Sequence, residues 1–143
     1  MRSSSILDHT ADVMIEGRGD TLEEAFEGIA IALQSVITDT SRIYEKKKLK
    51  ECIDLKSDKW EDWLFEFLNK IIFIKDTEKI VFKDIKVEIS ERSYGKELCF
   101  EIKGDKINFK KYEINVDVKG ASYSNLEVIK ERNYYICRCI VDV

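Results

Sequence analysis

Proline is absent from the 143 residues, and histidine occurs once, at His9. No apolar run approaches the ~20 residues needed to cross a bilayer, and the N-terminus has no signal-peptide pattern. The chain also has no Walker-type loop, no G-x-S-x-G, no H-E-x-x-H and no internal repeat. We therefore expect a cytoplasmic protein with no membrane partner, and no common motif assigns it a reaction.

Cysteine is scarce, with four residues at positions 52, 99, 137 and 139. They form no C-x-x-C motif and have no histidine nearby, so a tetrahedral zinc site has little support. We expect reduced, partly buried thiols that pack within strands.

A basic surplus is also missing, because the formal net charge is −4 and the pI is about 5.2. Binding of nucleic acid needs a basic stripe that displaces counterions, so this balance argues against direct RNA binding. The one dense basic run is Lys46-Lys47-Lys48 with Lys50. It can touch RNA, but we expect it to solubilise the start of a strand, and an acidic body suits a basic partner better.

The length and composition predict one domain, covering residues 1–143. A hydrophobic fraction of 44% beside a charged fraction of 36% suits one packed core with a solvated shell. A core of this size needs neither disulfides nor a structural metal.

Apolar residues at i, i+3 and i+4 spacing predict two amphipathic helices, at 22–37 and from about 58 to 72. Asp20 and Asp58 are the expected N-caps, each followed three residues later by a glutamate. Gly17-x-Gly19 resembles part of a dinucleotide fingerprint, but the third glycine is missing and Asp20 would repel a phosphate.

Alternating apolar residues predict a series of strands, joined by turns at 17–19, 93–96 and 104–106 and by a bulge or corner at 83–84. The segment 112–118 has the cleanest alternation. The overall order indicates an α+β fold, with two helices packed on a mostly antiparallel sheet. The expected strands are 13–15, 44–55, 80–89, 98–102, 112–118, 126–128 and 134–143.

Acidic groups lie at both ends of the sequence. The stretch Asp8-His9-Thr10-Ala11-Asp12 precedes a strand, and the last strand finishes with Asp142 and the carboxylate of Val143. Alone, such a stretch is more often a polar turn. A carboxylate that ends a buried strand nevertheless needs a positive partner. Arg138, in the same alternation phase as Asp142, is one candidate, and a hard divalent cation is another.

If the terminal strands are neighbours, Asp12, Asp142 and an oxygen of Val143 form an oxygen-ligand site. Such a site favours Ca²⁺, Mg²⁺ or Mn²⁺ over zinc or copper. His9 and Asp39 are possible additional ligands, although Asp39 is explained equally well as a polar residue at a helix end.

Four stretches occur together in an ordered pattern over nearly the whole chain. They are His9-Thr10-Ala11-Asp12, the helix from Thr21-Leu22-Glu23-Glu24-Ala25-Phe26 to Ile37-Thr38-Asp39, the Trp63-Leu64 helix running into Phe73, and the closing Ile140-Val141-Asp142-Val143. In these stretches and in length the chain resembles the archease family. It departs at Ser122-Tyr123-Ser124, where archeases typically carry Thr-Tyr-His, so no histidine role is carried over there.

The resemblance implies an archease-like fold and metal binding at the positions of Asp12, Asp142 and Val143, with Ca²⁺ the ion expected in a crystal. It also implies that the protein activates the RtcB-type tRNA-splicing RNA ligase by promoting ligase guanylylation and multiple turnover. The protein would then be an activator and no enzyme itself, and it would meet RNA only through the ligase.

Two other functions remain open at this point. A small metal-dependent phosphoesterase or hydrolase would use the same carboxylates, but His9 is its one convincing general base. A chaperone-like binding module would need no chemistry, and it leaves the acidic residues at both chain ends unexplained.

Overall fold

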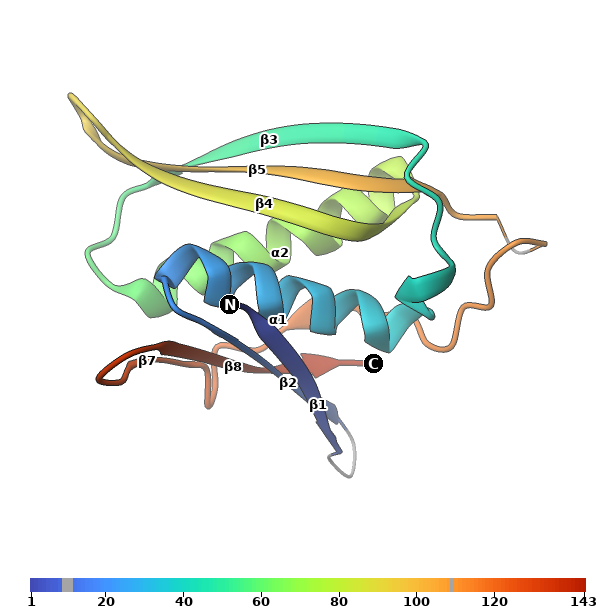
Figure 1. The fold of residues 1–143 in the computed structure, drawn as a ribbon, viewed down its shortest axis with the longest axis horizontal. Coiled ribbons are helices and arrows are strands. Elements are labelled where there is room, and N and C mark those ends of the chain that lie inside the picture. Colours follow the sequence, from blue (N-terminus) through green and yellow to red (C-terminus); the bar gives the residue numbers. More distant parts are fainter. Residues whose placement is uncertain (9–11, 109) are drawn as a thin grey trace.

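The computed structural model describes residues 1–8, 12–108 and 110–143. Helices α1 (Leu22–Ile37) and α2 (Trp60–Glu78) form a middle layer between two antiparallel sheets (Figure 1). This arrangement confirms the predicted α+β class, but the sheet is divided in two. The strands are β1 (Ser3–Asp8), β2 (Asp12–Gly19), β3 (Lys47–Leu55), β4 (Ile80–Arg92), β5 (Gly95–Lys106), β6 (Gly120–Ala121), β7 (Glu127–Lys130) and β8 (Tyr135–Asp142), and a short 3-10 helix, η1, covers Thr40–Arg42.

The five-stranded sheet joins the two ends of the described chain. Its order is β1-β2-β8-β6, and β7 also pairs with β8. The final hairpin of β7 and β8 confirms the sequence prediction. Strand β1 is missing from that prediction, because Ser3, Ser4 and Ser5 give no apolar alternation.

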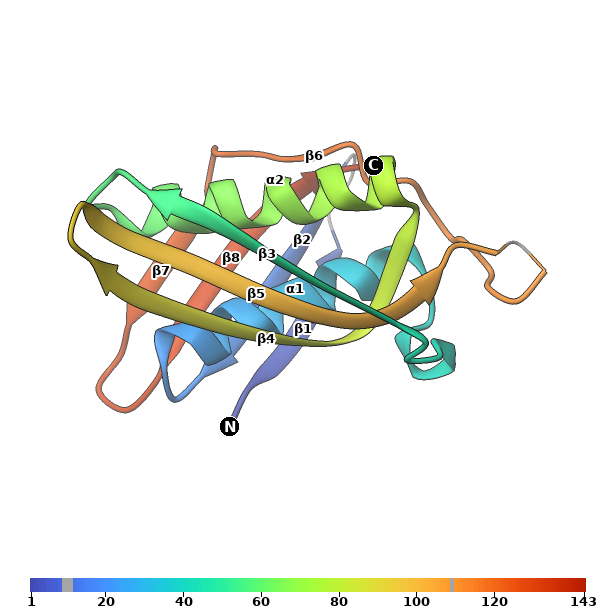
Figure 2. The same ribbon diagram turned by 90° about the horizontal axis from the view of Figure 1, so that it is seen from above.

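The three-stranded sheet has the order β3-β5-β4, and in Figure 2 its strands cross those of the other sheet at a steep angle. The β4–β5 hairpin and the irregularity between Phe82 and Asp84 confirm two predictions. The predicted turn at 104–106 is wrong, because these residues lie inside β5. A Cβ on Gly104 would lie 2.0 Å from the Val81 carbonyl oxygen, so the glycine permits a close approach beside the bulge.

The glycines of β2 likewise serve close packing. The predicted turn at 17–19 is wrong, because β2 continues through Gly19. A Cβ on Gly17 would lie 2.1 Å from the Ile29 nitrogen, and one on Gly28 would lie 2.4 Å from the Ser3 carbonyl oxygen. Helix α1 can therefore lie directly on β1 and β2 only because these positions lack side chains.

Both predicted helix caps are wrong by one residue. Thr21 caps α1 by accepting a hydrogen bond from the Glu24 amide at 3.1 Å, and its hydroxyl also donates to the Glu24 carboxylate at 3.3 Å. Lys59 precedes α2 without a side-chain cap. Aspartate and threonine are both good N-caps, so residue type alone cannot choose between adjacent positions.

The segment 112–118 belongs to no strand or helix. Its backbone groups bond to other elements: the Asn115 amide donates to the Ile37 carbonyl oxygen at 2.7 Å, and the Val118 carbonyl accepts from Lys75 Nζ at 2.8 Å. Tyr112 and Val118 are buried as the alternation indicates, whereas Val116 is exposed, and burial of alternate residues does not require a neighbouring strand.

Aromatic side chains link the middle layer to the three-stranded sheet. The ring centroids of Phe26 on α1 and Phe67 on α2 lie 5.5 Å apart, and Phe67 meets Phe100 on β5 edge-on at 5.4 Å. All three residues are buried. Burial of these rings fixes both helices against the sheet.

Candidate metal site at the paired strand ends

The structure brings Asp12 and Asp142 together. Strands β2 and β8 are antiparallel neighbours, and Asp12 lies directly opposite Asp142. Asp142 also lies opposite Gly120 of β6, so it is flanked on both sides. Asp12 is half-buried and Asp142 is exposed. The adjacency that the site requires is therefore present, although 130 positions separate the two residues in the sequence.

The two aspartates occupy the sheet face that points away from the helices. Val13 and Ile15 on β2 pack against the core, so Asp12 and Glu16, one residue out of phase, share the other face. Opposite residues on neighbouring strands point to the same face, and this places Asp142 beside Asp12. The pair is accessible from solvent at one end of the sheet.

Neither aspartate has a cationic partner among the described residues, since no ion pair found there includes Asp12 or Asp142. Arg138, which the sequence offered as a partner for Asp142, instead donates to Glu16 at 2.7 Å and to Glu127 at 3.4 Å. That hypothesis is therefore wrong, because Glu16 lies directly across the ladder from Arg138.

Glu16 forms the centre of a closed charge network. Its carboxylate accepts from Arg138 Nε at 2.7 Å, from Arg18 Nε at 3.2 Å and from Ser5 Oγ at 3.2 Å. Burial alone would raise the pKa of Glu16, but the hydrogen bonds from Arg138 and Arg18 outweigh it and hold the pKa below its usual value. The same strand pair thus has one carboxylate closed by ion pairs and, four residues away, two carboxylates to which the described residues supply no cation.

Asn69 on α2 positions the neighbouring strand β6. Its Oδ1 accepts from the Ala121 amide at 3.1 Å, and its Nδ2 donates to the Phe65 carbonyl oxygen at 3.1 Å. The Lys119 amide in turn donates to the Asp142 carbonyl oxygen at 2.8 Å. Sequence reasoning missed Asn69, because a polar residue on a helix gives no sign of a distant backbone partner.

Ser122-Tyr123-Ser124, where the chain departs from the family pattern, follows β6 directly. The Ser122 amide donates to the Ile140 carbonyl oxygen at 2.8 Å, and the Tyr123 hydroxyl donates to Asp62. This departure therefore lies beside β8, within two residues of Asp142.

The remaining candidate ligands have different outcomes. His9 lies outside the described residues. Val143 follows Asp142 directly and is partly exposed. Asp39 caps η1: its Oδ1 accepts from the Ser41 hydroxyl at 2.7 Å and from the Ser41 amide at 3.1 Å, and these bonds hold the pKa of Asp39 below its usual value. Asp39 is thus accounted for locally, and its role as a ligand stays a prediction.

The chemistry of the pair fits a hard cation. Two carboxylates directly opposite each other repel, and a divalent ion bound by their oxygens would remove that repulsion. Oxygen donors favour Ca²⁺, Mg²⁺ or Mn²⁺, and the partly exposed edge leaves space for further oxygen ligands. The donor set therefore agrees with the predicted class of ion.

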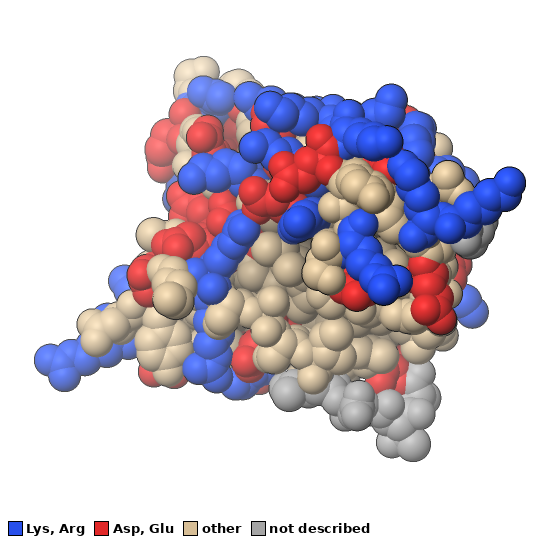
Figure 3. Space-filling model, turned by 45° about the vertical axis from the view of Figure 1, so that its right-hand side comes forward, with Lys and Arg blue, Asp and Glu red and all other residues tan. Residues whose placement is uncertain are grey.

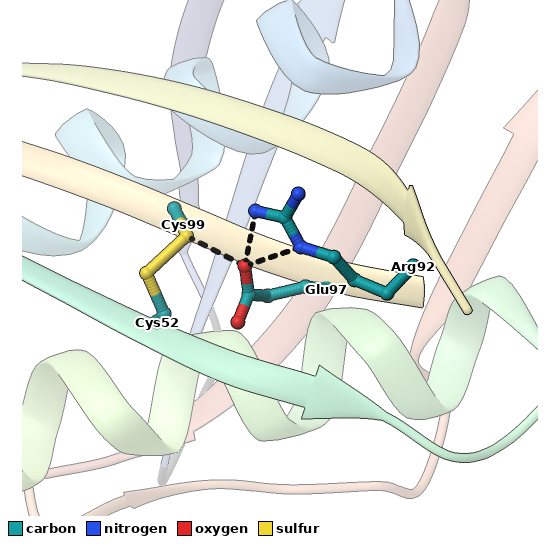
Figure 4. The surroundings of a disulfide bond; sticks show 4 residues. All are labelled: Cys52, Arg92, Glu97 and Cys99. Atoms are coloured by element: carbon teal, nitrogen blue, oxygen red, sulfur yellow. Dashed lines mark hydrogen bonds and ion pairs between the residues drawn. A yellow bond between two sulfur atoms is a disulfide. The ribbon is translucent and has the colours of Figure 1, made fainter. Parts of the chain in front are cut away.

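A second group of potential metal ligands contains two cysteines that form a disulfide with each other. Cys52 on β3 and Cys99 on β5 lie directly opposite each other and are bonded (Figure 4). The prediction of four reduced thiols is therefore wrong for this pair, because the strand register that joins residues 47 positions apart cannot be read from spacing. With Glu97 they form the one cluster of three possible ligands found among the described residues, but both sulfurs are bonded to each other.

The other two cysteines are free and buried, as expected. Burial raises the pKa of Cys139 to about 12, and it also raises the pKa of Cys137 far above its usual value. Both remain protonated thiols at neutral pH and act as packing residues.

The fold and the paired carboxylates define a class: a three-layer α+β protein with an acidic sheet end. Residues 5–143 match the model of the Archease protein family (MTH1598/TM1083). Protein archease of Pyrococcus abyssi is 37% identical over 123 residues, which are 86% of this chain and 85% of that protein. Protein archease of Methanothermobacter thermautotrophicus is 31% identical over the full length of both chains. The chain belongs to the archease family.

Solved structures agree. The solution structure of Methanobacterium thermoautotrophicum protein 1598 is similar with a TM-score of 0.86 and 31% identity, covering 99% of both chains. The crystal structure of an archease from Thermotoga maritima, described as a possible chaperone, has a TM-score of 0.56 at 16% identity and covers 96% of this chain and 94% of that one. The second likeness shows a shared fold alone. Over the described residues, no helix has the length and apolar character needed to cross a membrane.

Proposed function

We propose that this protein is an accessory factor that activates an RtcB-type tRNA-splicing RNA ligase, promoting ligase guanylylation and multiple turnover. Family membership supports the proposal, and the observation that carries it is the direct pairing of Asp12 with Asp142 at an exposed sheet end. A surface that holds two unneutralised carboxylates is suited to recruit a cation rather than to stabilise the fold.

In this proposal Asp12 and Asp142 hold a divalent cation, with an oxygen of Val143 as a further donor. The cation supplies a Lewis-acidic centre that can accept oxygen ligands from the partner. The chain itself supplies position: β2 and β8 fix the two carboxylates, while Asn69 and the Lys119 amide fix β6 beside them. The Glu16 network keeps Arg138 away from Asp142 and so leaves the pair available.

A chaperone-like binding module is the second candidate, favoured by the description of the T. maritima relative as a possible chaperone. The two functions differ in one respect. Ligase activation through the paired carboxylates requires both aspartates, whereas chaperone-like binding does not.

A multiple-turnover ligation assay tests the proposal. Purified protein is added to the ligase of its host with GTP, a divalent cation and RNA ends. Asp12→Asn and Asp142→Asn should each strongly reduce activation, whereas Asp58→Asn, at an exposed position just before α2, should not. Full activation by both site variants would reject the metal-dependent proposal and favour the chaperone-like one.

A further inference from the structure

The overall acidity of the chain conceals a local basic surface. Residues 44–50 and 103–111 carry eight lysines against two acidic residues, a formal charge of +6. Because the whole chain totals −4, the remainder carries −10. We call the eight lysines the lysine surface: Lys46, Lys47, Lys48, Lys50, Lys103, Lys106, Lys110 and Lys111.

Strand pairing brings the two segments together. Among the described residues, β3 is an edge strand that pairs only with β5, and Lys48 lies directly opposite Lys103. Acidic residues face two of these lysines, because Lys50 lies opposite Glu101 and Lys103 also lies opposite Asp84 of β4. Figure 3 shows Lys and Arg side chains gathered along the side of the molecule where the three-stranded sheet lies. Like charges directly opposite each other destabilise a strand pair, so the pairing of Lys48 with Lys103 does not serve the stability of the sheet.

Most of these charges are not neutralised within the described residues. Lys111 contacts Asp105 at 3.3 Å, and Lys106 donates to the Glu78 carbonyl oxygen at 2.8 Å. No ion pair found in the described part of the chain includes any of the other six. Five of these six lysines, all except the half-buried Lys103, are exposed, so their charge is available to an anionic partner.

An exposed aromatic ring lies within the lysine surface. Tyr44 is 56% exposed, and the ammonium nitrogens of Lys46 and Lys111 lie 5.4 Å and 4.9 Å from its ring centroid. Each lysine is within cation–π distance, so two positive charges lie beside one exposed ring.

A buried network holds the backbone of Tyr44. The hydroxyl of Tyr112 donates to Asp105 at 2.7 Å and accepts from the Tyr44 amide at 3.2 Å. Tyr112 and Asp105 are both buried. Asp105 also accepts from Lys111 Nζ at 3.3 Å, so the same carboxylate links Lys111, through Tyr112, to the backbone of Tyr44. Buried groups thus hold the backbone of Tyr44 and the side chain of Lys111.

We propose that the lysine surface binds single-stranded RNA directly, through its phosphates and through contact of an unpaired base with Tyr44. Recognition of single-stranded RNA needs two elements, which are basic side chains along the phosphate backbone and an exposed aromatic ring that contacts a base. The lysine surface and Tyr44 supply them. The inference goes beyond ligase activation, because it gives this chain its own contact with RNA. The lysine surface lies on the three-stranded sheet and the paired aspartates lie on the other sheet, so both can be engaged at once (Figure 1).

Fluorescence anisotropy with a short labelled single-stranded RNA tests the inference. We expect a dissociation constant on the order of 10⁻⁵ M at moderate salt. Replacing Lys46, Lys48 and Lys50 together by Gln should weaken binding by about tenfold or more, and it should reduce the slope of log K against log salt by about 2. Tyr44→Ala should weaken binding by about fivefold or more, and Tyr44→Phe should restore it.

The matched control replaces three exposed lysines elsewhere, Lys56, Lys59 and Lys130, by Gln and so changes the net charge equally. Equal weakening in the control and the lysine-surface variant would overturn the inference, since binding would then follow net charge alone. Equal binding of polyglutamate, with no effect of Tyr44→Ala on either ligand, would overturn it in favour of an acidic protein partner.

The ligase assay separates this inference from the proposed function. RNA binding that survives Asp12→Asn while activation is lost supports both. Loss of RNA binding in the lysine-surface variant supports the inference whatever happens to activation. Absence of RNA binding by the wild type overturns the inference and leaves the ligase proposal to its own test.

Discussion

Two regions of the β2–β8 strand pair differ in whether their carboxylates are paired with a cation. At Glu16 and Arg138 a carboxylate lies across the ladder from a guanidinium and is closed by further bonds from Arg18 and Ser5. Four residues further along, Asp12 lies across from Asp142, and no described side chain neutralises either. The first pair holds the sheet together, whereas the second weakens it, so the second is the place where function explains the sequence better than stability does.

The disulfide offers the strongest test of what a closed cross-strand pair contributes. Cys52 and Cys99 join the edge strand β3 to β5. Opening a loop of this length should lower the free energy of unfolding by about 3–4 kcal/mol. Denaturant unfolding with and without a reducing agent measures this loss, and the double variant Cys52→Ser/Cys99→Ser should show no response to the reductant. We expect no effect on ligase activation, and none from Cys137→Ser.

Removing Arg138 should break the closed charge pair. Arg138→Met leaves the buried Glu16 carboxylate with Arg18 and Ser5 alone, so we expect a loss of about 2–3 kcal/mol in unfolding free energy. Urea unfolding at pH 7 gives the value. A loss below about 0.5 kcal/mol would mean that the network contributes no more than an exposed ion pair.

A divalent cation bound by Asp12 and Asp142 should stabilise the folded protein. Saturating Ca²⁺ or Mn²⁺ binds only the folded chain, so it should stabilise the wild type by about 1–3 kcal/mol. Thermal unfolding in EDTA and in added cation measures the shift. Asp142→Asn should lose most of it, and Asp58→Asn should retain it.

Acid should weaken the closed pair in a defined direction. The folded-state pKa of Glu16 lies below its ordinary value of 4.5. Its contribution to stability is therefore fully present above about pH 4.5 and is lost as the pH falls through the folded-state pKa. Unfolding curves measured from pH 6 to pH 3 should fall more steeply for the wild type than for Arg138→Met. Parallel curves would show that other carboxylates dominate acid unfolding.

Periodic patterns predicted the parts of the fold that depend on neighbours in sequence. Both helices, the β4–β5 hairpin, the bulge near Lys83 and the last hairpin are confirmed. The failures involve partners distant in sequence. Gly17 and Gly104 lie inside strands and not in turns, because each leaves space for the backbone of another element. Segment 112–118 is not a strand, because its hydrogen bonds go to a helix end and a lysine.

The candidate site shows the same division. The carboxylates of Asp12 and Asp142 favour a hard cation, and the family resemblance assigns both residues to one metal site. The strand register shows that they are neighbours. Strand register also determines two contacts that the spacing of residues in the sequence does not predict. Arg138 pairs with Glu16, and Cys52 is bonded to Cys99. Asn69, which anchors the strand beside Asp142, left no signal in the sequence.

Calorimetric titration of Mn²⁺ or Ca²⁺ tests the shared site most directly. The wild type should bind one equivalent, and Asp12→Asn and Asp142→Asn should each weaken binding by roughly tenfold or more, because each removes one of two carboxylate ligands. Without metal, both variants should be at least as stable as the wild type, since the repulsion between the two carboxylates is relieved. Unchanged metal affinity in both variants, with Asp58→Asn as the matched control, would contradict a cation shared by the two ends of the sheet.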